Sequence, residues 1–122
     1  MRVIEDIISD RGSKYAVSGA PCGSEEEAKA LIRELKKSKK FAKATHNTWG
    51  MIGAEGPVKN DDGESGAGAI TLRMLERAGL RDHLIVVTRW YGGKHLGGDR
   101  FRHVQDAVRI YLADLGLSAG GG

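Results

Sequence analysis

Residues 84–102 read LIVVTRWYGGKHLGGDRFR and pass from an apolar run, through a basic turn with two glycine pairs, into an amphipathic segment. The run Leu84–Val87 contains no polar residue, which is typical of a central strand covered on both faces. The segment that follows repeats apolar residues at helical intervals from about Asp99, the predicted N-cap, to Gly116. A strand, a glycine-rich turn and a helix start in this order commonly form a binding site, so we expect function to lie here.

The segments before this stretch predict a hairpin and a helix. Residues 3–8 and 14–20 are β-prone runs, and residues 10–12, Asp-Arg-Gly, separate them with the composition of a hairpin turn. Ser24 and Glu27 have the spacing of a capping box, and the apolar residues that follow recur on one helical face. We therefore expect two paired strands followed by a helix.

The middle of the chain predicts a strand, a loop and a second helix. Residues 45–52 alternate as a strand does, residues 53–65 are polar and glycine-containing, and the helix after them ends at Gly79. The resulting order is strand, strand, helix, strand, helix, strand, helix. It predicts an α+β two-layer sandwich (ββαβαβα), with the helices packed on one face of the sheet.

Composition limits the functional classes. With 122 residues, 40% of them hydrophobic, the chain fits one domain, which we place at residues 1–117, followed by a flexible glycine-rich tail at 118–122. The net charge of +3 permits an anionic partner without identifying it. The single Cys22 cannot form an internal disulfide, and no apolar run approaches the roughly 20 residues of a membrane span. We expect a cytoplasmic protein without a membrane partner.

The basic turn supplies the first group of candidate binding residues. Glycine pairs admit positive φ and close backbone approach, so they favour an anion-binding nest, although they equally favour a sharp structural turn. Cationic side chains offer charge-assisted bonds to phosphate, and either Trp90 or Tyr91 can stack on a base, because adjacent strand residues face opposite sides. The candidates are Arg89, Tyr91, Gly92, Gly93, Lys94, His95, Gly97, Asp99 and Arg100.

The acidic loop and one histidine form the second group. The acids could hold a divalent cation, cap the helix that starts near Ser65, or face Arg89 or Lys94 in a charged cluster. His46 could act as a general acid or base, but the sequence places no serine or second histidine to complete a nucleophilic pair, which favours an ordinary core or surface histidine. These candidates are His46, Asp61, Asp62, Gly63, Glu64 and Ser65. We assign no catalytic residue or metal ligand and expect no cofactor.

Three stretches resemble a known family: KATHNTWG at 43–50, DDGESGAG at 61–68 and VVTRWYGGKHLGGDRFRH at 86–103. They are similar to the IMPACT family, which includes the bacterial YigZ proteins and the yeast IMPACT homologue. The resemblance runs from about residue 13 to 115. It implies a fold like the second domain of ribosomal protein S five and a role in tuning translation under stress. The RWD domain of IMPACT and the ferredoxin-like domain of YigZ have no counterpart in these 122 residues.

Three functional hypotheses follow. The first is a non-enzymatic module of translation regulation that binds RNA, the ribosome or a translation-associated protein through the basic glycine-rich cleft. The second is a metal-assisted phosphate-handling enzyme that uses the acidic loop at 61–65. The third is a protein interaction domain, or a homo-oligomer, that acts through an unknown partner. The sequence leaves the oligomeric state open.

Overall fold

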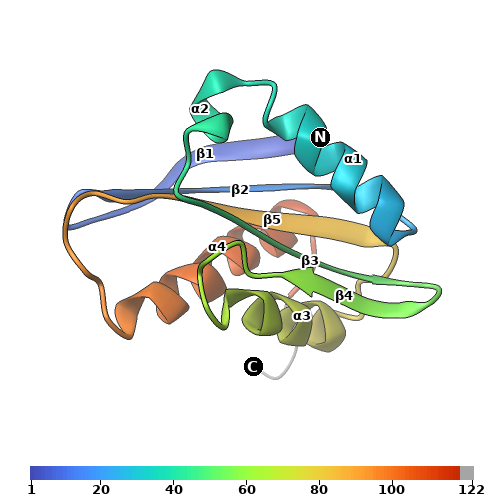
Figure 1. Cartoon of the computed structure of the whole chain (residues 1–122). Coiled ribbons are helices and arrows are strands. Elements are labelled where there is room, and N and C mark those ends of the chain that lie inside the picture. The colour runs from blue at the N-terminus through green and yellow to red at the C-terminus, as the bar shows by residue number, and fades with distance from the viewer. Residues whose placement is uncertain (119–122) are drawn as a thin grey trace.

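The computed structural model describes residues 1–118 and shows a five-stranded antiparallel sheet with four helices (Figure 1). The strand order is β1-β2-β5-β3-β4. The strands are β1 (Arg2–Asp10), β2 (Ser13–Pro21), β3 (His46–Gly53), β4 (Gly56–Asn60) and β5 (His83–Trp90). The helices are α1 (Glu25–Leu35), α2 (Lys39–Ala42), α3 (Ala67–Ala78) and α4 (Asp99–Asp114).

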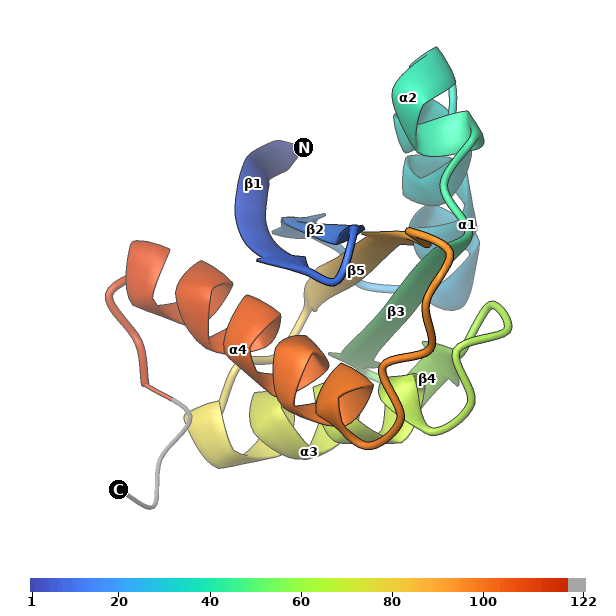
Figure 2. The ribbon, with the colours of Figure 1, turned by 90° about the vertical axis from the view of Figure 1, so that its left-hand side faces the viewer.

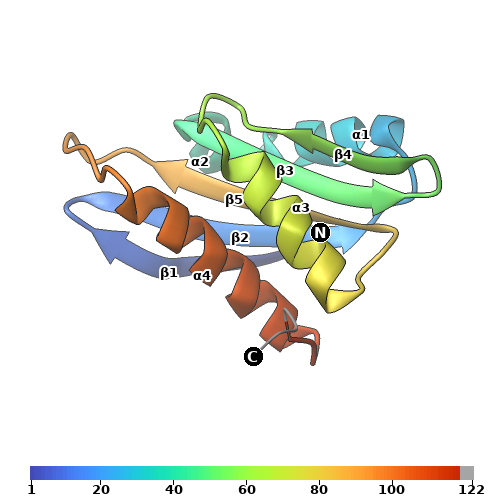
Figure 3. The same ribbon diagram turned by 90° about the horizontal axis from the view of Figure 1, so that it is seen from below.

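The predicted α+β sandwich is confirmed, but helices cover both faces of the sheet. Helices α1 and α2 lie on one face, and α3 and α4 lie side by side on the other (Figures 1 and 3). The apolar run of β5 explains this arrangement, because its side chains alternate between two cores. Leu84 and Val86 pack under α1 and α2, whereas Ile85 and Val87 pack under α3 and α4. The expectation of helices on a single face is therefore wrong, and the central position predicted for this strand is confirmed.

The predicted loop at residues 53–65 contains a strand. Residues Gly56–Asn60 form β4, which pairs with β3 from Gly53 to Trp49 across a two-residue turn. The sequence of this strand contains a glycine, a proline and an asparagine and only one β-prone residue, Val58. Its pairing with the buried β3 decides its conformation. The functional loop is therefore shorter and begins after Asn60.

Helix α1 begins as the capping box predicts. The Ser24 side chain accepts a hydrogen bond from the Glu27 N–H at 3.2 Å, and the Glu27 carboxylate accepts one from the Gly23 N–H at 3.1 Å. The lysine-rich segment that follows does not simply extend this helix. It turns after Leu35 and forms the short α2, which buries Phe41 against the sheet.

The connection at residues 91–98, which we call the basic loop, crosses one end of the sheet from β5 to α4 (Figure 2). Its Gly92 lies against the β1–β2 turn, where an added Cβ would be 2.0 Å from the carbonyl carbon of Gly12. Helix α4 takes Gly98 as its N-cap, so the prediction of Asp99 is wrong by one residue. The Asp99 carboxylate bonds the Arg11 guanidinium at 2.6 Å instead of the helix N–H groups.

The structure describes the predicted domain, residues 1–117, in full. Of the predicted tail at 118–122, all but Ser118 lies outside the described residues. None of the helices in the described part of the chain is both long and apolar enough to span a bilayer.

Candidate functional site

A buried ion pair lies beneath the basic loop. Arg89, near the end of β5, is 5% exposed, and Glu64, in the loop before α3, is 3% exposed. The Arg89 Nη1 donates to Glu64 Oε1 at 2.9 Å and lies 3.3 Å from Oε2. The pair joins a central strand to the acidic loop. Because both charges are withdrawn from water, each depends on the other for compensation.

Aromatic rings enclose the Arg89 guanidinium. Its Cζ lies 5.9 Å from the centre of the Tyr15 ring and 5.7 Å from that of Tyr91. Its Nη2 donates to Ser13 Oγ at 3.4 Å, whereas its Nε and the Tyr15 hydroxyl are buried without a hydrogen-bond partner among residues 1–118. Burial raises the pKa of Tyr15 to about 12, although the nearby Arg89 charge opposes this shift. Tyr15 is therefore a neutral phenol at physiological pH.

His46 ties the acidic loop to β3. Its Nδ1 lies 2.8 Å from the Asp62 carbonyl oxygen, and its Nε2 lies 3.3 Å from Glu64 Oε2. A carbonyl only accepts, so Nδ1 carries a hydrogen and donates it. The contact with the Glu64 carboxylate is then a hydrogen bond when Nε2 is also protonated. Both ring nitrogens of His46 face groups of the protein, which supports the structural interpretation over that of a free general base.

The three acids of the loop bind three different groups. Asp61 accepts hydrogen bonds from the N–H groups of Gly66 at 3.1 Å and Gly68 at 2.7 Å and so caps α3. Burial opposes ionisation of Asp61, but these two hydrogen bonds lower its pKa. Asp62 accepts from the Asn47 N–H at 2.7 Å. No group of three or more His, Cys, Asp or Glu side chains within residues 1–118 could hold a metal ion. The geometry thus supports the helix-cap interpretation for Asp61 and the charged-cluster interpretation for Glu64.

The two remaining candidates of the acidic loop have simpler surroundings. Gly63 has φ +86°, and an added Cβ would lie 3.1 Å from the His46 ring. Glycine therefore allows both the left-handed turn and the approach of His46. Ser65 is exposed beside them.

The basic loop is held at its start by two hydrogen bonds and farther along by one buried side chain. The Tyr91 N–H donates to Thr45 Oγ1 at 2.9 Å, and the Gly92 N–H donates to Ser13 Oγ at 3.3 Å. Leu96 is 4% exposed and packs into the core under α4. Gly93 and Gly97 have positive φ, with open space where a side chain would stand. The loop is therefore a fixed platform, and the close approach of Gly92 favours the structural interpretation at that glycine.

Between these anchors the loop exposes aromatic and basic side chains. Tyr91 is 43% exposed, and its ring lies 5.9 Å from that of His95. Lys94 and His95 are exposed. The neighbouring Trp90 faces the other way, where it packs on Phe41 and donates to the Lys40 carbonyl at 2.9 Å. The two adjacent aromatic residues thus face opposite sides, and Tyr91 is the one that is exposed on the basic loop.

The last two candidates lie at the start of α4. Asp99 contacts Arg11 at 2.6 Å and Arg102 at 3.4 Å, so it joins the β1–β2 turn to the helix. The Arg100 guanidinium lies over the Phe101 ring, with its Cζ 4.5 Å from the ring centre. The structure thus divides the predicted site in two: the buried Arg89 and Glu64 form a cluster with the partly buried His46, whereas Tyr91, Lys94 and His95 form the surface above it.

Sequence reasoning missed Ser13, Tyr15 and Thr45, which hold Arg89 and the basic loop. Tyr15 and Ser13 belong to β2 and lie more than 70 residues from the loop in the chain. No local motif marks them. The pairing of Tyr15 with Arg89 across β2 and β5 brings these distant residues together.

Comparison with known proteins gives a consistent result. The model of the Impact N-terminal domain matches residues 11–112. The IMPACT homologue of Caenorhabditis elegans is 37% identical over 117 residues, covering 89% of this chain and 46% of that protein. The IMPACT homologue of Saccharomyces cerevisiae is 37% identical over 121 residues (93% and 46%), and IMPACT of Bos taurus is 37% identical over 113 residues (88% and 36%). The chain spans less than half the length of these relatives.

Two solved structures share the fold. The crystal structure of a hypothetical protein aligns with a TM-score of 0.78 at 22% identity, covering 96% of this chain and 59% of that one, and supports the fold alone. The two-domain translational regulator Yih1 aligns with a TM-score of 0.52 at 30% identity, covering 93% of this chain and 45% of that one. From the domain match and the identity to IMPACT proteins of worm, yeast and cattle over most of its length, we conclude that the chain belongs to the IMPACT family, defined by the Impact N-terminal domain.

Proposed function

We propose that this chain is a non-enzymatic binding domain of translation regulation and that its basic loop contacts ribosomal RNA. Membership of the IMPACT family and the likeness to a solved translational regulator support the first part. The single observation that carries the second is that Tyr91, Lys94 and His95 are exposed together on a loop fixed from below. A fixed loop loses little conformational freedom on binding.

The chemistry of these side chains suits RNA. A lysine ammonium attracts phosphate as a point charge, and a tyrosine or histidine ring stacks on an unpaired base. Arg89 has a different role from the one that its charge predicted. It is compensated by Glu64 and supports the loop from the interior, so it does not itself bind phosphate in this proposal. Such a function places the protein in the cytoplasm, where translation takes place.

The buried cluster supports a non-enzymatic function. His46, Asp61, Asp62 and Glu64 each bind a partner within the protein, and Glu64 is also buried. The alternative of a metal-assisted enzyme requires these acids to converge on one cation. They diverge toward a helix end, a strand N–H and a guanidinium.

Sedimentation of tagged protein through sucrose gradients of a lysate of its source organism tests the proposal. We expect salt-sensitive comigration with ribosomal particles, which the triple change Y91A, K94A and H95A abolishes. The matched control is Arg109→Ala, which removes an exposed cation from α4 that pairs with Asp106. If the wild-type protein stays at the top of the gradient at low salt, the proposal is wrong. If the triple variant still comigrates with ribosomal particles, the basic loop is not the contact, and that part of the proposal is wrong.

A further inference from the structure

The structure has a second recognition surface, and we propose that it binds a short extended protein segment that is acidic at its N-terminal end. The surface is the groove between α1 and β4, on the sheet face opposite α3 and α4. Two cavities of about 560 and 220 Å³ lie along it. It shares no lining residue with the basic loop, so this inference stands independently of the proposed function.

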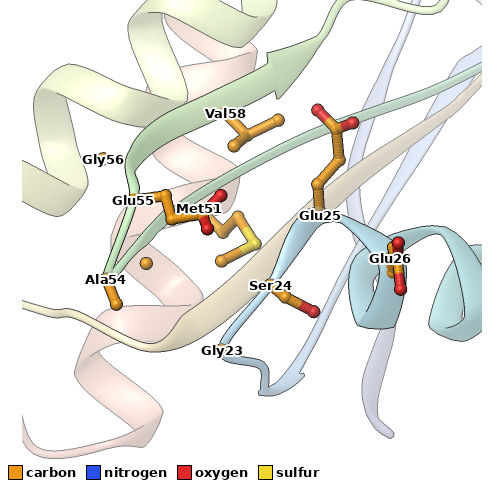
Figure 4. Close-up of a pocket in the computed structure, with 10 residues that line it drawn as sticks. Gly23, Ser24, Glu25, Glu26, Met51, Ala54, Glu55, Gly56 and Val58 are labelled. Atoms are coloured by element: carbon orange, nitrogen blue, oxygen red, sulfur yellow. The ribbon is translucent and has the colours of Figure 1, made fainter.

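The groove has one floor and one wall along its length. Its floor is made by β3 and β4, where Met51 stands opposite Val58 and Trp49 opposite Asn60 in the strand register. Its wall is the side of α1. Figure 4 shows Val58 and Glu25 pointing toward one another across the larger cavity, with the Met51 side chain below them. The larger cavity therefore has an apolar floor and an acidic rim.

Opposite charges mark the two ends of the groove. Lys29, Arg33 and Lys36 line the smaller cavity. Lys29 has a partner in Glu25 at 3.4 Å, but Arg33 and Lys36 form no ion pair within residues 1–118. Side chains i, i+4 and i+7 of a helix share one face, so these cations are aligned along the wall. They would be compensated by carboxylates of a ligand.

The other end is acidic. The rim of the larger cavity carries Glu25, Glu26 and Glu55. A segment that matches both ends thus has acidic residues at one end, basic residues at the other and apolar residues between them for Met51 and Val58.

The free edge of β4 supplies backbone groups for such a segment. In the described part of the chain β4 pairs only with β3. Gly53 and Gly56 close a two-residue hairpin, which makes theirs a hydrogen-bonded pair, so the next pair, Ile52 with Pro57, is not hydrogen-bonded and Pro57 offers only its C=O at the free edge. By alternation, Val58 bonds to β3, whereas the N–H and C=O of Lys59 face outward. A peptide residue opposite Lys59 can exchange two hydrogen bonds with it, as in other cases of strand addition.

Length and direction follow from the same geometry. The wall from Glu25 to Lys36 rises about 16 Å, which an extended segment of about five residues spans. Strand β4 runs from the acidic end, at Gly56, to the basic end, at Asn60. Antiparallel pairing, the more stable arrangement, places the N-terminus of the ligand at the basic end. Its acidic residues therefore come first.

Fluorescence anisotropy with two labelled seven-residue peptides tests this inference. The first has two acidic residues, then alternating valine and threonine, then two basic residues; the second has the same composition with its charged ends exchanged. We expect the first peptide to bind with a Kd below about 1 mM and the second at least about fivefold more weakly. Equal binding of both peptides, or binding of neither, would overturn the proposal.

Variants separate the charge contacts from the backbone contacts. The double change R33A and K36A weakens binding of the first peptide by about fivefold, because two partly exposed ion pairs are lost. Lys37→Ala, which removes a cation of the same segment paired with Glu34, has no such effect. Lys59→Pro removes the outward N–H and abolishes binding, whereas Lys59→Ala retains it.

The backbone test does not depend on folding of the proline variant. Thermal unfolding checks that Lys59→Pro is folded. The wild-type protein is tested in parallel with the first peptide N-methylated at its central residue, which removes the reciprocal donor. Undiminished binding of the methylated peptide, or of a folded Lys59→Pro variant, would show that no strand is added to β4 and would overturn the proposal.

Discussion

The Arg89–Glu64 pair predicts a large loss of stability when one partner is neutralised. Replacing Glu64 by glutamine leaves a buried guanidinium without a counter-charge, and removal of one partner of a buried pair typically costs about 3–5 kcal/mol. The full range applies because the two side chains are only 4% and 6% exposed. A domain of 122 residues has a free energy of unfolding of about 5–15 kcal/mol, so this loss is a large fraction of the total.

Urea unfolding followed by tryptophan fluorescence measures the loss. With an m-value of about 1.5–2 kcal/mol per M, a loss of about 4 kcal/mol lowers the unfolding midpoint by about 2 M. The matched control is Asp106→Ala, which breaks a pair with Arg109 whose side chains are 43% and 57% exposed, and it should cost less than about 1 kcal/mol.

A double change shows whether Glu64→Gln loses stability because the Arg89 charge is left uncompensated or because the side-chain packing is altered. In Arg89→Met with Glu64→Gln no charge remains uncompensated, so we expect this variant to be more stable than Glu64→Gln alone. If Glu64→Gln shifts the midpoint no further than Asp106→Ala does, the pair does not anchor the acidic loop, and the argument that it supports the basic loop fails.

Three further changes test other parts of the structure. Gly92→Ala should lower the free energy of unfolding in urea by about 2 kcal/mol or more, because the added Cβ meets the Gly12 backbone. Gly98→Ala is the control: its position has open space and a negative φ, so the free energy of unfolding should change by less than about 0.5 kcal/mol. Burial lowers the pKa of His83, so below about pH 6.5 the unfolded chain binds more protons than the folded protein, and the free energy of unfolding should fall. Urea unfolding at about pH 7.5 and 5.5 measures this fall, which should be smaller in His83→Gln. Ser24→Ala removes the cap of α1 and should cost about 1 kcal/mol by the same assay.

The fold was largely predictable because its elements carry local signals. The uninterrupted apolar run placed β5 at the centre of the sheet, and Ser24 with Glu27 marked the start of α1. Strand β4 carried no such signal, since its conformation comes from pairing with β3. The placement of helices on both faces of the sheet was also missed, although the apolar run of β5 indicated a strand covered on both sides. It depends on which side of the sheet α1 crosses, which periodicity within one helix does not determine.

The candidate site was predictable as a region but not as a set of roles. Arg89 and Lys94 have similar charge in the sequence, yet one is buried against Glu64 and the other is exposed. The difference arises from Tyr15 and Ser13, which reach Arg89 through the pairing of β2 with β5. Contacts between residues so far apart in the chain leave no motif in a single sequence.

Site-specific photocrosslinking tests the central claim, that the basic loop contacts ribosomal RNA, most directly. A photoreactive amino acid is placed at His95 on the exposed loop, and in a control protein at Arg109 on α4. Each protein is irradiated with purified ribosomal particles of the source organism. The account predicts a crosslink to ribosomal RNA from position 95 that high salt suppresses, and none from position 109. Crosslinks from position 109 but not from position 95, or none from either, would contradict it.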